Sequence, residues 1–316
     1  MRVCCFIAVG GALAILFAAN AAESNSASPS ARNQPITVYE KSSGKLLLFG
    51  GWQAHGVASD VWTWDGRWAT ATLGPPGRGS HAMAYDSRRN TTVLFGGSNN
   101  AGHLADTWTH FNGKWTPQAV DGPPARDAHR MVYDSSRGRV VLFGGVGDHD
   151  QILNDTWEWN GEAWTQQNVA APPARFHQGM VFDSRRKITI LFGGRTSFKE
   201  TSPSLGDMWA WDGSTWHEIH GEVPPPRDHP GMAYDPVRGE IVMFGGHSNG
   251  KHFDETWISK GSNWRRAAVS GPSPRAASAM AFDDKRETII LYGGTGHHGD
   301  LADLWEWNGR QWKQIQ

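Results

Sequence analysis

One unit of about 50 residues repeats six times and accounts for nearly all of the 316-residue chain. In each copy an apolar stretch ends in an aromatic residue followed by two glycines. These triplets are Phe49–Gly51, Phe95–Gly97, Phe143–Gly145, Phe192–Gly194, Phe244–Gly246 and Tyr292–Gly294. A unit this short cannot bury its own hydrophobic face, so the period indicates a repeat architecture in which neighbouring units stack.

The third copy shows the predicted strands of one unit most clearly. Residues His129–Tyr133 and Arg139–Phe143 form the first two, with a turn between them. Asp155–Trp159 alternates with period two, and Asn160-Gly161 is a strong signal for a two-residue hairpin leading into the fourth strand. Four short antiparallel strands per unit, punctuated by Gly and Pro, are typical of a propeller blade. The sequence therefore predicts an all-β protein, a six-bladed β-propeller.

The predicted organisation is a signal peptide at 1–22, a flexible leader at 23–31 and the propeller at 32–316. The blades are expected at about 32–73, 74–121, 122–170, 171–222, 223–270 and 271–316. With these boundaries every blade is contiguous in the sequence, and packing alone joins the last blade to the first. The alternative is a set of shifted boundaries, for which one strand is exchanged between the last blade and the first.

The first 22 residues predict export, to a secreted or periplasmic location. A basic start is followed by an apolar run from Val3 to Phe17 and a small-residue cleavage pattern at Ala19–Ala21. An uncleaved anchor is the alternative; after cleavage no membrane span is expected. The only cysteines, Cys4 and Cys5, lie in this segment, so the mature chain is expected to have no disulfide and no cysteine chemistry. The formal charge of −1 argues against a general nucleic-acid surface.

The double glycines, the later Trp pairs and the Pro-x-Arg start of most units resemble the kelch repeat, over about Pro29 to Gln316. The resemblance implies the fold but not one function, because kelch propellers include enzymes, partner-binding modules and scaffolds. Some grip acidic peptides through arginines at this position, and some exported bacterial ones isomerise sialic acid. Galactose oxidase shares the fold but needs a cysteine linked to a tyrosine, so that copper chemistry is not expected here.

Strand direction divides the loops between two faces of the ring. The loops between the second and third strands, and the connections between blades, share what we call the loop face; the remaining turns lie on the turn face. Of the 14 histidines, 11 are expected on the loop face. An arginine also begins each blade there: Arg32, Arg78, Arg126, Arg175, Arg227 and Arg275. Loops on a rigid scaffold commonly carry binding residues.

Arginines that lean toward the central channel would form a basic funnel suited to carboxylates or sulfates. Alternatively, each arginine hydrogen-bonds carbonyl groups of the neighbouring blade. Positions that differ between blades are more informative, because a ligand rarely has six-fold symmetry. Trp52, the one Trp outside the hairpins, could stack on a sugar or be an exposed loop residue. The predicted ligand-binding residues are Arg78, His81, Arg126, Asp127, His129, Arg175, His177, Arg227 and Trp52.

No cofactor is predicted, although two histidine-rich loops offer ligands for a divalent metal. These loops contain Asp148, His149 and Asp150 in one case and His297 and His298 in the other. Solvent-facing polar loops are the alternative. No nucleophile elbow, phosphate loop or paired-carboxylate motif is present in the sequence.

The resulting prediction is a monomeric binding module whose loop face takes an acidic glycan or an acidic protein segment. The alternative is a sugar-modifying enzyme similar to a sialic-acid epimerase. In that case His129 or His177 would carry the proton, because histidine titrates near neutrality. A structural envelope protein is the third possibility, for which no substitution in the funnel would matter.

Overall fold

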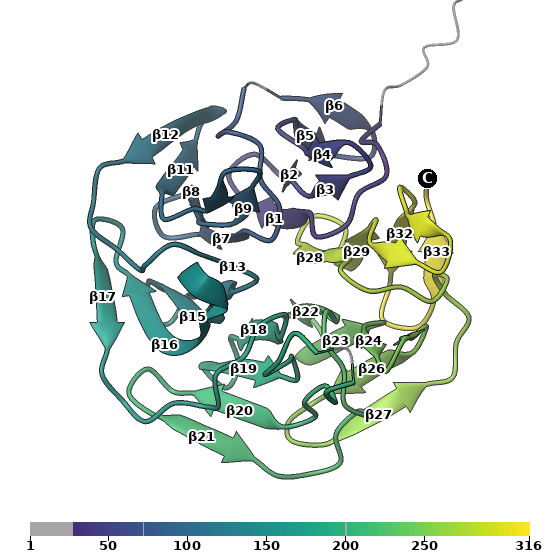
Figure 1. Ribbon diagram of the computed structural model, residues 1–316. Coiled ribbons are helices and arrows are strands. Elements are labelled where there is room, and N and C mark those ends of the chain that lie inside the picture. Colours follow the sequence, from purple (N-terminus) through teal and green to yellow (C-terminus); the bar gives the residue numbers. More distant parts are fainter. Residues whose placement is uncertain (1–27, 72, 200) are drawn as a thin grey trace, which may run out of the picture.

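The computed structural model describes residues 28–71, 73–199 and 201–316 and confirms a six-bladed β-propeller. Figure 1 shows the blades arranged in a ring, and cavities lined by the innermost strands form a channel at its centre. The described residues include no α-helix, only the short 3₁₀ helix η1 (Asp148–Asp150). They contain no helix long and apolar enough to cross a bilayer. The predicted signal peptide and residues 23–27 of the leader lie outside the described residues.

Each blade is a sheet whose strands follow one another from the channel outward. The innermost strands are β1 (Ile36–Glu40), β7 (Ala82–Asp86), β14 (Arg130–Asp134), β18 (Gly179–Asp183), β22 (Gly231–Asp235) and β28 (Ala279–Asp283). The second strands are β2 (Lys45–Phe49), β8 (Thr91–Phe95), β15 (Arg139–Gly147), β19 (Ile188–Phe192), β23 (Glu240–Phe244) and β29 (Thr288–Tyr292). The third strands are β5 (Val61–Trp64), β11 (Thr107–Phe111), β16 (Ile152–Trp159), β20 (Met208–Trp211), β26 (Thr256–Ser259) and β32 (Leu304–Trp307). The outermost strands are β6 (Trp68–Thr70), β12 (Lys114–Gln118), β17 (Trp164–Gln167), β21 (Trp216–Ile219), β27 (Trp264–Ala267) and β33 (Trp312–Gln314).

The ring closes without strand exchange, as predicted by the boundaries that make every blade contiguous. The first blade pairs as β1-β2-β5-β6 and the last as β28-β29-β32-β33, so each sheet uses consecutive strands. Backbone hydrogen bonds join these two blades: the N–H of Gly294 donates to the carbonyl of Arg32 at 3.1 Å, and the N–H of Arg32 donates to Leu301 at 3.2 Å. The Tyr292 hydroxyl also donates to the carbonyl of Pro29 at 2.9 Å. The C-terminus accordingly lies beside the first blade in Figure 1.

The loop face has more regular structure than the sequence predicted. Four of the loops between second and third strands form short hairpins, because the residue after the double glycine pairs across a tight turn. These hairpins are β3 (Trp52–Gln53) with β4 (Gly56–Val57), β9 (Ser98–Asn99) with β10 (Gly102–His103), β24 (His247–Ser248) with β25 (Lys251–His252), and β30 (Thr295–Gly296) with β31 (Gly299–Asp300). In the third blade β15 and β16 instead extend across a bulge after Phe143, and β13 (Arg126–Asp127) pairs with the end of β15.

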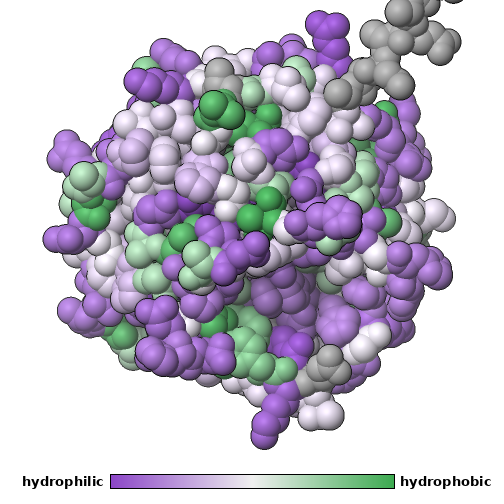
Figure 2. Space-filling view, turned by 45° about the horizontal axis from the view of Figure 1, so that its top comes forward, coloured by the Kyte–Doolittle hydropathy of each residue, from purple (hydrophilic) through white to green (hydrophobic). Residues whose placement is uncertain are grey.

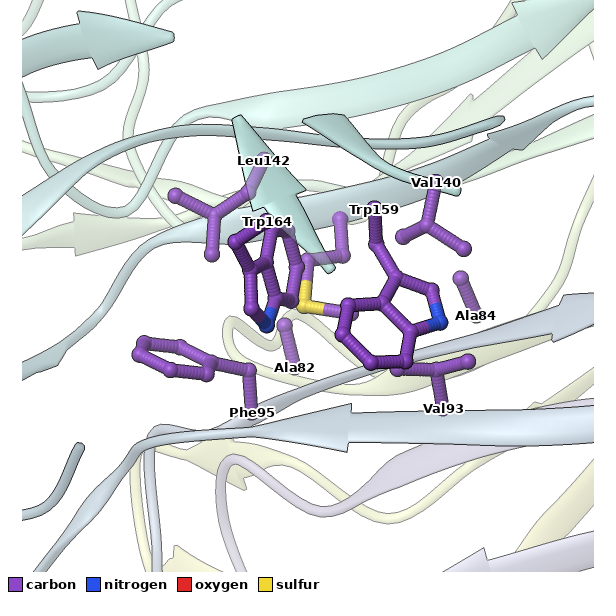
Figure 3. Packing of buried hydrophobic residues seen from close by; sticks show 9 residues of the cluster. Ala82, Ala84, Val93, Phe95, Val140, Leu142, Trp159 and Trp164 are labelled. Carbon is purple, nitrogen blue, oxygen red and sulfur yellow. The ribbon is translucent and has the colours of Figure 1, made fainter. Parts of the chain in front are cut away.

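Tryptophan rings fill the spaces between blades. Between the second and third blades, Trp159 and Trp164 lie with ring centroids 5.5 Å apart. They pack with Phe95, Ala84 and Val140, as Figure 3 shows. Trp159 is only 2% exposed, and Trp164 also donates its indole N–H to the Thr107 hydroxyl of the preceding blade at 2.9 Å. The repeated Trp residues are therefore a structural wedge between blades.

The double glycines bring consecutive blades into close backbone contact. Gly144 has φ +69°, and a Cβ there would lie 2.6 Å from the Arg175 carbonyl of the next blade. We expect Gly144→Ala to lower the free energy of unfolding by about 3 kcal/mol, from left-handed strain plus the steric overlap. The measurement is a urea-unfolding midpoint. Gly113→Ala is the control, because Gly113 has φ +77° with no atom within 4 Å of the added Cβ. Equal losses of unfolding free energy for the two variants would show that steric overlap adds nothing at Gly144.

Candidate functional site on the loop face

The six arginines do not line a funnel; each is a clamp inside its own blade. All six side chains are 0% exposed. Arg126 donates to both carboxylate oxygens of Asp155 at 2.6 and 2.7 Å, to the carbonyl of Gly144 at 3.1 Å and to Pro124 at 3.1 Å. These contacts engage all three guanidinium nitrogens and four of the five N–H groups, and the side chain is fully buried, so Arg126 is not available to a ligand.

The same clamp recurs around the ring. Each arginine contacts the acidic residue that precedes the hairpin Trp of its blade, in the pairs Arg32–Asp60, Arg78–Asp106, Arg175–Asp207, Arg227–Glu255 and Arg275–Asp303. The prediction that Arg78, Arg126, Arg175 and Arg227 bind a ligand is therefore replaced by the alternative, in which each arginine hydrogen-bonds backbone carbonyls. That alternative needs one correction, because it placed the carbonyls in the neighbouring blade. Their side chains bond carbonyls of their own blade, and their backbone carbonyls accept from the preceding one, as when Gly97 donates to Arg126 at 2.9 Å.

His81 and His129 are also withdrawn from the surface. Both are 0% exposed and pack edge-on against Phe49 and Phe95 of the preceding blades, at centroid distances of 5.3 and 5.7 Å. Burial, reinforced by Arg78, lowers the pKa of His81 to about 3. Burial and Arg126 likewise hold the pKa of His129 well below its usual value. His129 therefore has no solvent-facing nitrogen with which to serve as the proton carrier suggested by the sequence.

A belt of backbone hydrogen bonds surrounds the channel at the loop face. The second residue after each arginine has positive φ: Gln34, Ser80, Ala128, His177, His229 and Ala277. The N–H of one member donates to the carbonyl of the member in the preceding blade. These hydrogen bonds run from Gln34 to Ala277, Ala128 to Ser80, His177 to Ala128, His229 to His177 and Ala277 to His229, at 2.8–3.0 Å. The belt fixes these six side chains around the channel mouth.

Side chains from three blades form a hydrogen-bonded relay over this belt. Trp52 donates its indole N–H to the Ser80 hydroxyl at 3.2 Å, and Ser80 donates to the Gln34 side-chain oxygen. The Gln34 amide nitrogen lies 3.2 Å from Nε2 of His229, in the fifth blade. Since Gln34 donates there, His229 is neutral, with its proton on Nδ1, 2.6 Å from Asp228. Trp52 is thus part of the relay, packed over Gly79 rather than projecting freely.

Asp228 is the charged centre of this region. It is 1% exposed, and Ser204 donates to its Oδ2 at 2.7 Å. Burial alone would raise its pKa, but contacts with His229 and His247 hold the pKa of Asp228 well below its usual value. Burial lowers the pKa of His229 against the opposing effect of Asp228. Asp228 therefore remains ionised and fixes the orientation of the neutral imidazole.

More histidines surround this pair. His177 stacks on His229 with ring centroids 3.5 Å apart. His252 lies 5.3 Å from both His247 and His297 by ring centroid. Burial, with His247 and His297 nearby, lowers the pKa of His252. Burial also lowers the pKa values of His177 and His229, so the rings of His177, His229 and His252 present a polar surface in their neutral form.

A pocket of about 290 Å³ opens beside the relay. Its polar lining comes from the first, fourth, fifth and sixth blades: Asn33, Gln34, Arg195, Asp228, His229, His247, His252 and Thr295. Arg195 is 15% exposed, and its Nε lies 4.0 Å from Asp228. Phe198, 50% exposed, stacks on Phe176 of the same blade. The surface seen in Figure 2 is mostly hydrophilic, which agrees with recognition by polar groups.

Other predicted residues lie elsewhere on the loop face. Asp127 accepts from Ser98 at 2.5 Å and lies 3.6 Å from His103, between the second and third blades. His149 lies on η1 with Asp148 and Asp150. Nowhere in residues 28–71, 73–199 and 201–316 do three or more His, Cys, Asp or Glu side chains form a group able to hold a metal. Of the predicted site residues, the structure therefore places His177, Trp52 and the metal candidate His297 beside the pocket or its relay.

The chain belongs to the kelch-repeat family. A family model, the KLHDC2/KLHL20/DRC7 Kelch-repeats domain, matches residues 63–212 and 109–257, which together span more than half of the chain. Comparison with curated proteins gave no match. The protein is therefore a six-bladed kelch propeller, a class of domain that typically serves as a protein-binding module.

Proposed function

We propose that the protein is an exported binding module that holds an acidic glycan or an acidic protein segment at the 290 Å³ pocket of the loop face. The observation that carries the proposal is the pocket lining, in which polar side chains from four blades converge. These are positions that differ between blades, unlike the six clamps. Arg195 supplies a permanent positive charge, and a bound anion would favour the protonated form of His252.

The pocket suits an anion better at mildly acidic pH. Asp228 is already satisfied by His229 and Ser204, so an incoming carboxylate meets Arg195 and the histidine rings. A bound anion raises the pKa of a neighbouring imidazole and is in turn held more tightly by the protonated ring. Affinity is therefore expected to rise as the pH falls and protonation of His252 becomes less costly.

The test is calorimetric titration with glucuronic acid, N-acetylneuraminic acid and a hexaglutamate peptide, with glucose and a Gly-Ser peptide as neutral controls. We expect at least one acidic probe to bind more tightly at pH 5.5 than at pH 7.5. Arg195→Gln should weaken that binding about tenfold, the effect of one charge-assisted hydrogen bond. Arg310→Gln makes the same change at an exposed turn-face residue and should have no effect. Binding that ignores Arg195 and pH would reject the site.

The Asp228–His229 pair favours a second candidate, an enzyme that moves a proton on a bound sugar. A carboxylate that orients a neutral histidine is a common general-base arrangement. His229 replaces His129 in this role, because of these two residues only His229 lines the pocket. His229→Asn, in which asparagine tolerates the positive φ, should then abolish turnover of the bound sugar while leaving its binding measurable. Tight binding without turnover in the unmodified protein would favour the binding module.

A further inference from the structure

The turn-face end of the channel is lined by aromatic rings. Each innermost strand contributes one of them near its end: Tyr39, Tyr85, Tyr133, Phe182, Tyr234 and Phe282. Together with the smaller apolar residues one position earlier, they line a cavity of about 330 Å³. All six rings are partly exposed. The turn face is therefore not only a set of charged turns, because its centre is an apolar funnel.

Methionine side chains form a collar further inside the channel. Five of the six innermost strands carry Met at the same position, and the sixth carries Thr37: Met83, Met131, Met180, Met232 and Met280. These six residues line both the aromatic funnel and a smaller inner cavity of about 110 Å³. Methionine is flexible and adapts its shape to what it contacts. The two cavities are thus consecutive segments of one channel, separated by an adaptable wall.

One arginine faces the inner cavity. Arg130 begins β14, where the other blades have Ile36, Ala82, Gly179, Gly231 and Ala279. Its one hydrogen bond runs from Nη1 to the carbonyl of His129 at 3.3 Å, and no described carboxylate pairs with it. Burial lowers the pKa of Arg130 to about 10, which leaves it protonated at neutral pH. The contrast with the six clamp arginines, each bound to an acidic residue, marks Arg130 as an available cation.

We propose that the channel is a second binding site, for a small amphiphilic carboxylate that enters from the turn face. Its apolar body would lie among the aromatic rings and methionines, and its carboxylate would accept hydrogen bonds from the guanidinium of Arg130. Charge complementarity identifies the occupant, because a partly exposed arginine in the channel wall with no carboxylate partner among the described residues is best satisfied by a carboxylate in fork geometry. At the loop face the belt encircles the channel mouth and the Gln34–His229 contact narrows it, which makes the turn face the route of access.

Calorimetric titration with 3-phenylpropanoate tests this site, with 3-phenylpropan-1-ol as the uncharged match. We expect the carboxylate to bind at least tenfold more tightly than the alcohol. Arg130→Gln should remove that difference, whereas Arg130→Lys should keep part of it. Arg88→Gln makes the same change at an exposed turn-face residue outside the cavity lining and serves as the matched control. Arg195→Gln should leave the titration unchanged, which separates this site from the loop-face pocket.

A second variant and a thermal melt distinguish loss of the site from loss of the fold. Ser135 is an exposed residue at the rim of the funnel, so Ser135→Trp should obstruct the channel and weaken carboxylate binding while Arg130 stays intact. A thermal melt checks that each variant remains folded. Equal affinity for acid and alcohol, an acid affinity unaffected by Arg130→Gln, or no heat from the carboxylate with the unmodified protein would each overturn the proposal.

Discussion

Replacing Arg126 with alanine is expected to lower the free energy of unfolding by about 3 kcal/mol, and Tm by roughly 5–10 °C. The variant removes the guanidinium from the carboxylate of Asp155, which keeps only its hydrogen bond from the Trp157 indole, and removes the donor to the carbonyl of Gly144. Removing one member of a buried pair typically costs 3–5 kcal/mol, and the low end applies because the Asp155 side chain is 18% exposed. The measurement is urea unfolding at pH 7, with Arg310→Ala, at an exposed turn, as the control.

The stability difference between the unmodified protein and Arg126→Ala should also depend on pH. Burial raises the pKa of Asp155, but the hydrogen bonds from Arg126 and Trp157 outweigh it, and the net pKa lies below the usual 3.8. An acid whose pKa is lowered on folding stabilises the native state above its unfolded pKa and loses that effect as the pH falls through the folded value. The gap between the unmodified protein and Arg126→Ala should therefore be full at pH 5 and shrink below about pH 4. A gap that stays constant down to pH 2 would contradict the clamp.

Replacing Trp159 with alanine is expected to cost about 3–5 kcal/mol, the range for truncation of a large buried ring. Its ring is packed on both sides, by the third blade and by Ala84 and Val93 of the second. The loss of stability should appear as a lower urea concentration at the unfolding midpoint, and Trp159→Phe should recover part of the lost stability. Phe111→Ala is the comparison, because Phe111 is 51% exposed and should matter far less. A loss below about 1 kcal/mol for Trp159→Ala would mean that the wedge is not the main inter-blade contact.

Local patterns were sufficient to predict the blades. The alternation in Asp155–Trp159 and the Asn160-Gly161 turn each act over a few residues, and the predicted strand Arg139–Phe143 lies within the observed β15. The direction of the arginines was harder, because each precedes its strand and no periodicity orients it. A signal did exist in the sequence. An arginine and an acidic residue that both recur in every blade, most often 28 residues apart, are candidates for a repeated ion pair.

The site itself depends on contacts that no local pattern contains. Gln34 and His229 are 195 residues apart and meet only because the ring closes. Arg130 could have been found by comparing blades one position further along, where a single charge stands among small and apolar residues. His129, one position earlier, was predicted as a site residue, but its side chain faces the preceding blade instead of the channel.

The clamps also bear on how such a chain reaches its native state. Each joins residues only 28 to 32 positions apart, so the strongest polar contact of a blade is complete once that blade's own residues are available. Local contacts of this kind favour fast folding and allow segments to form in order during synthesis. The contacts between Arg32 and the last blade are the exception, since they span the whole ring. Blades can therefore assemble one after another, with docking of the sixth against the first as the late, slow event.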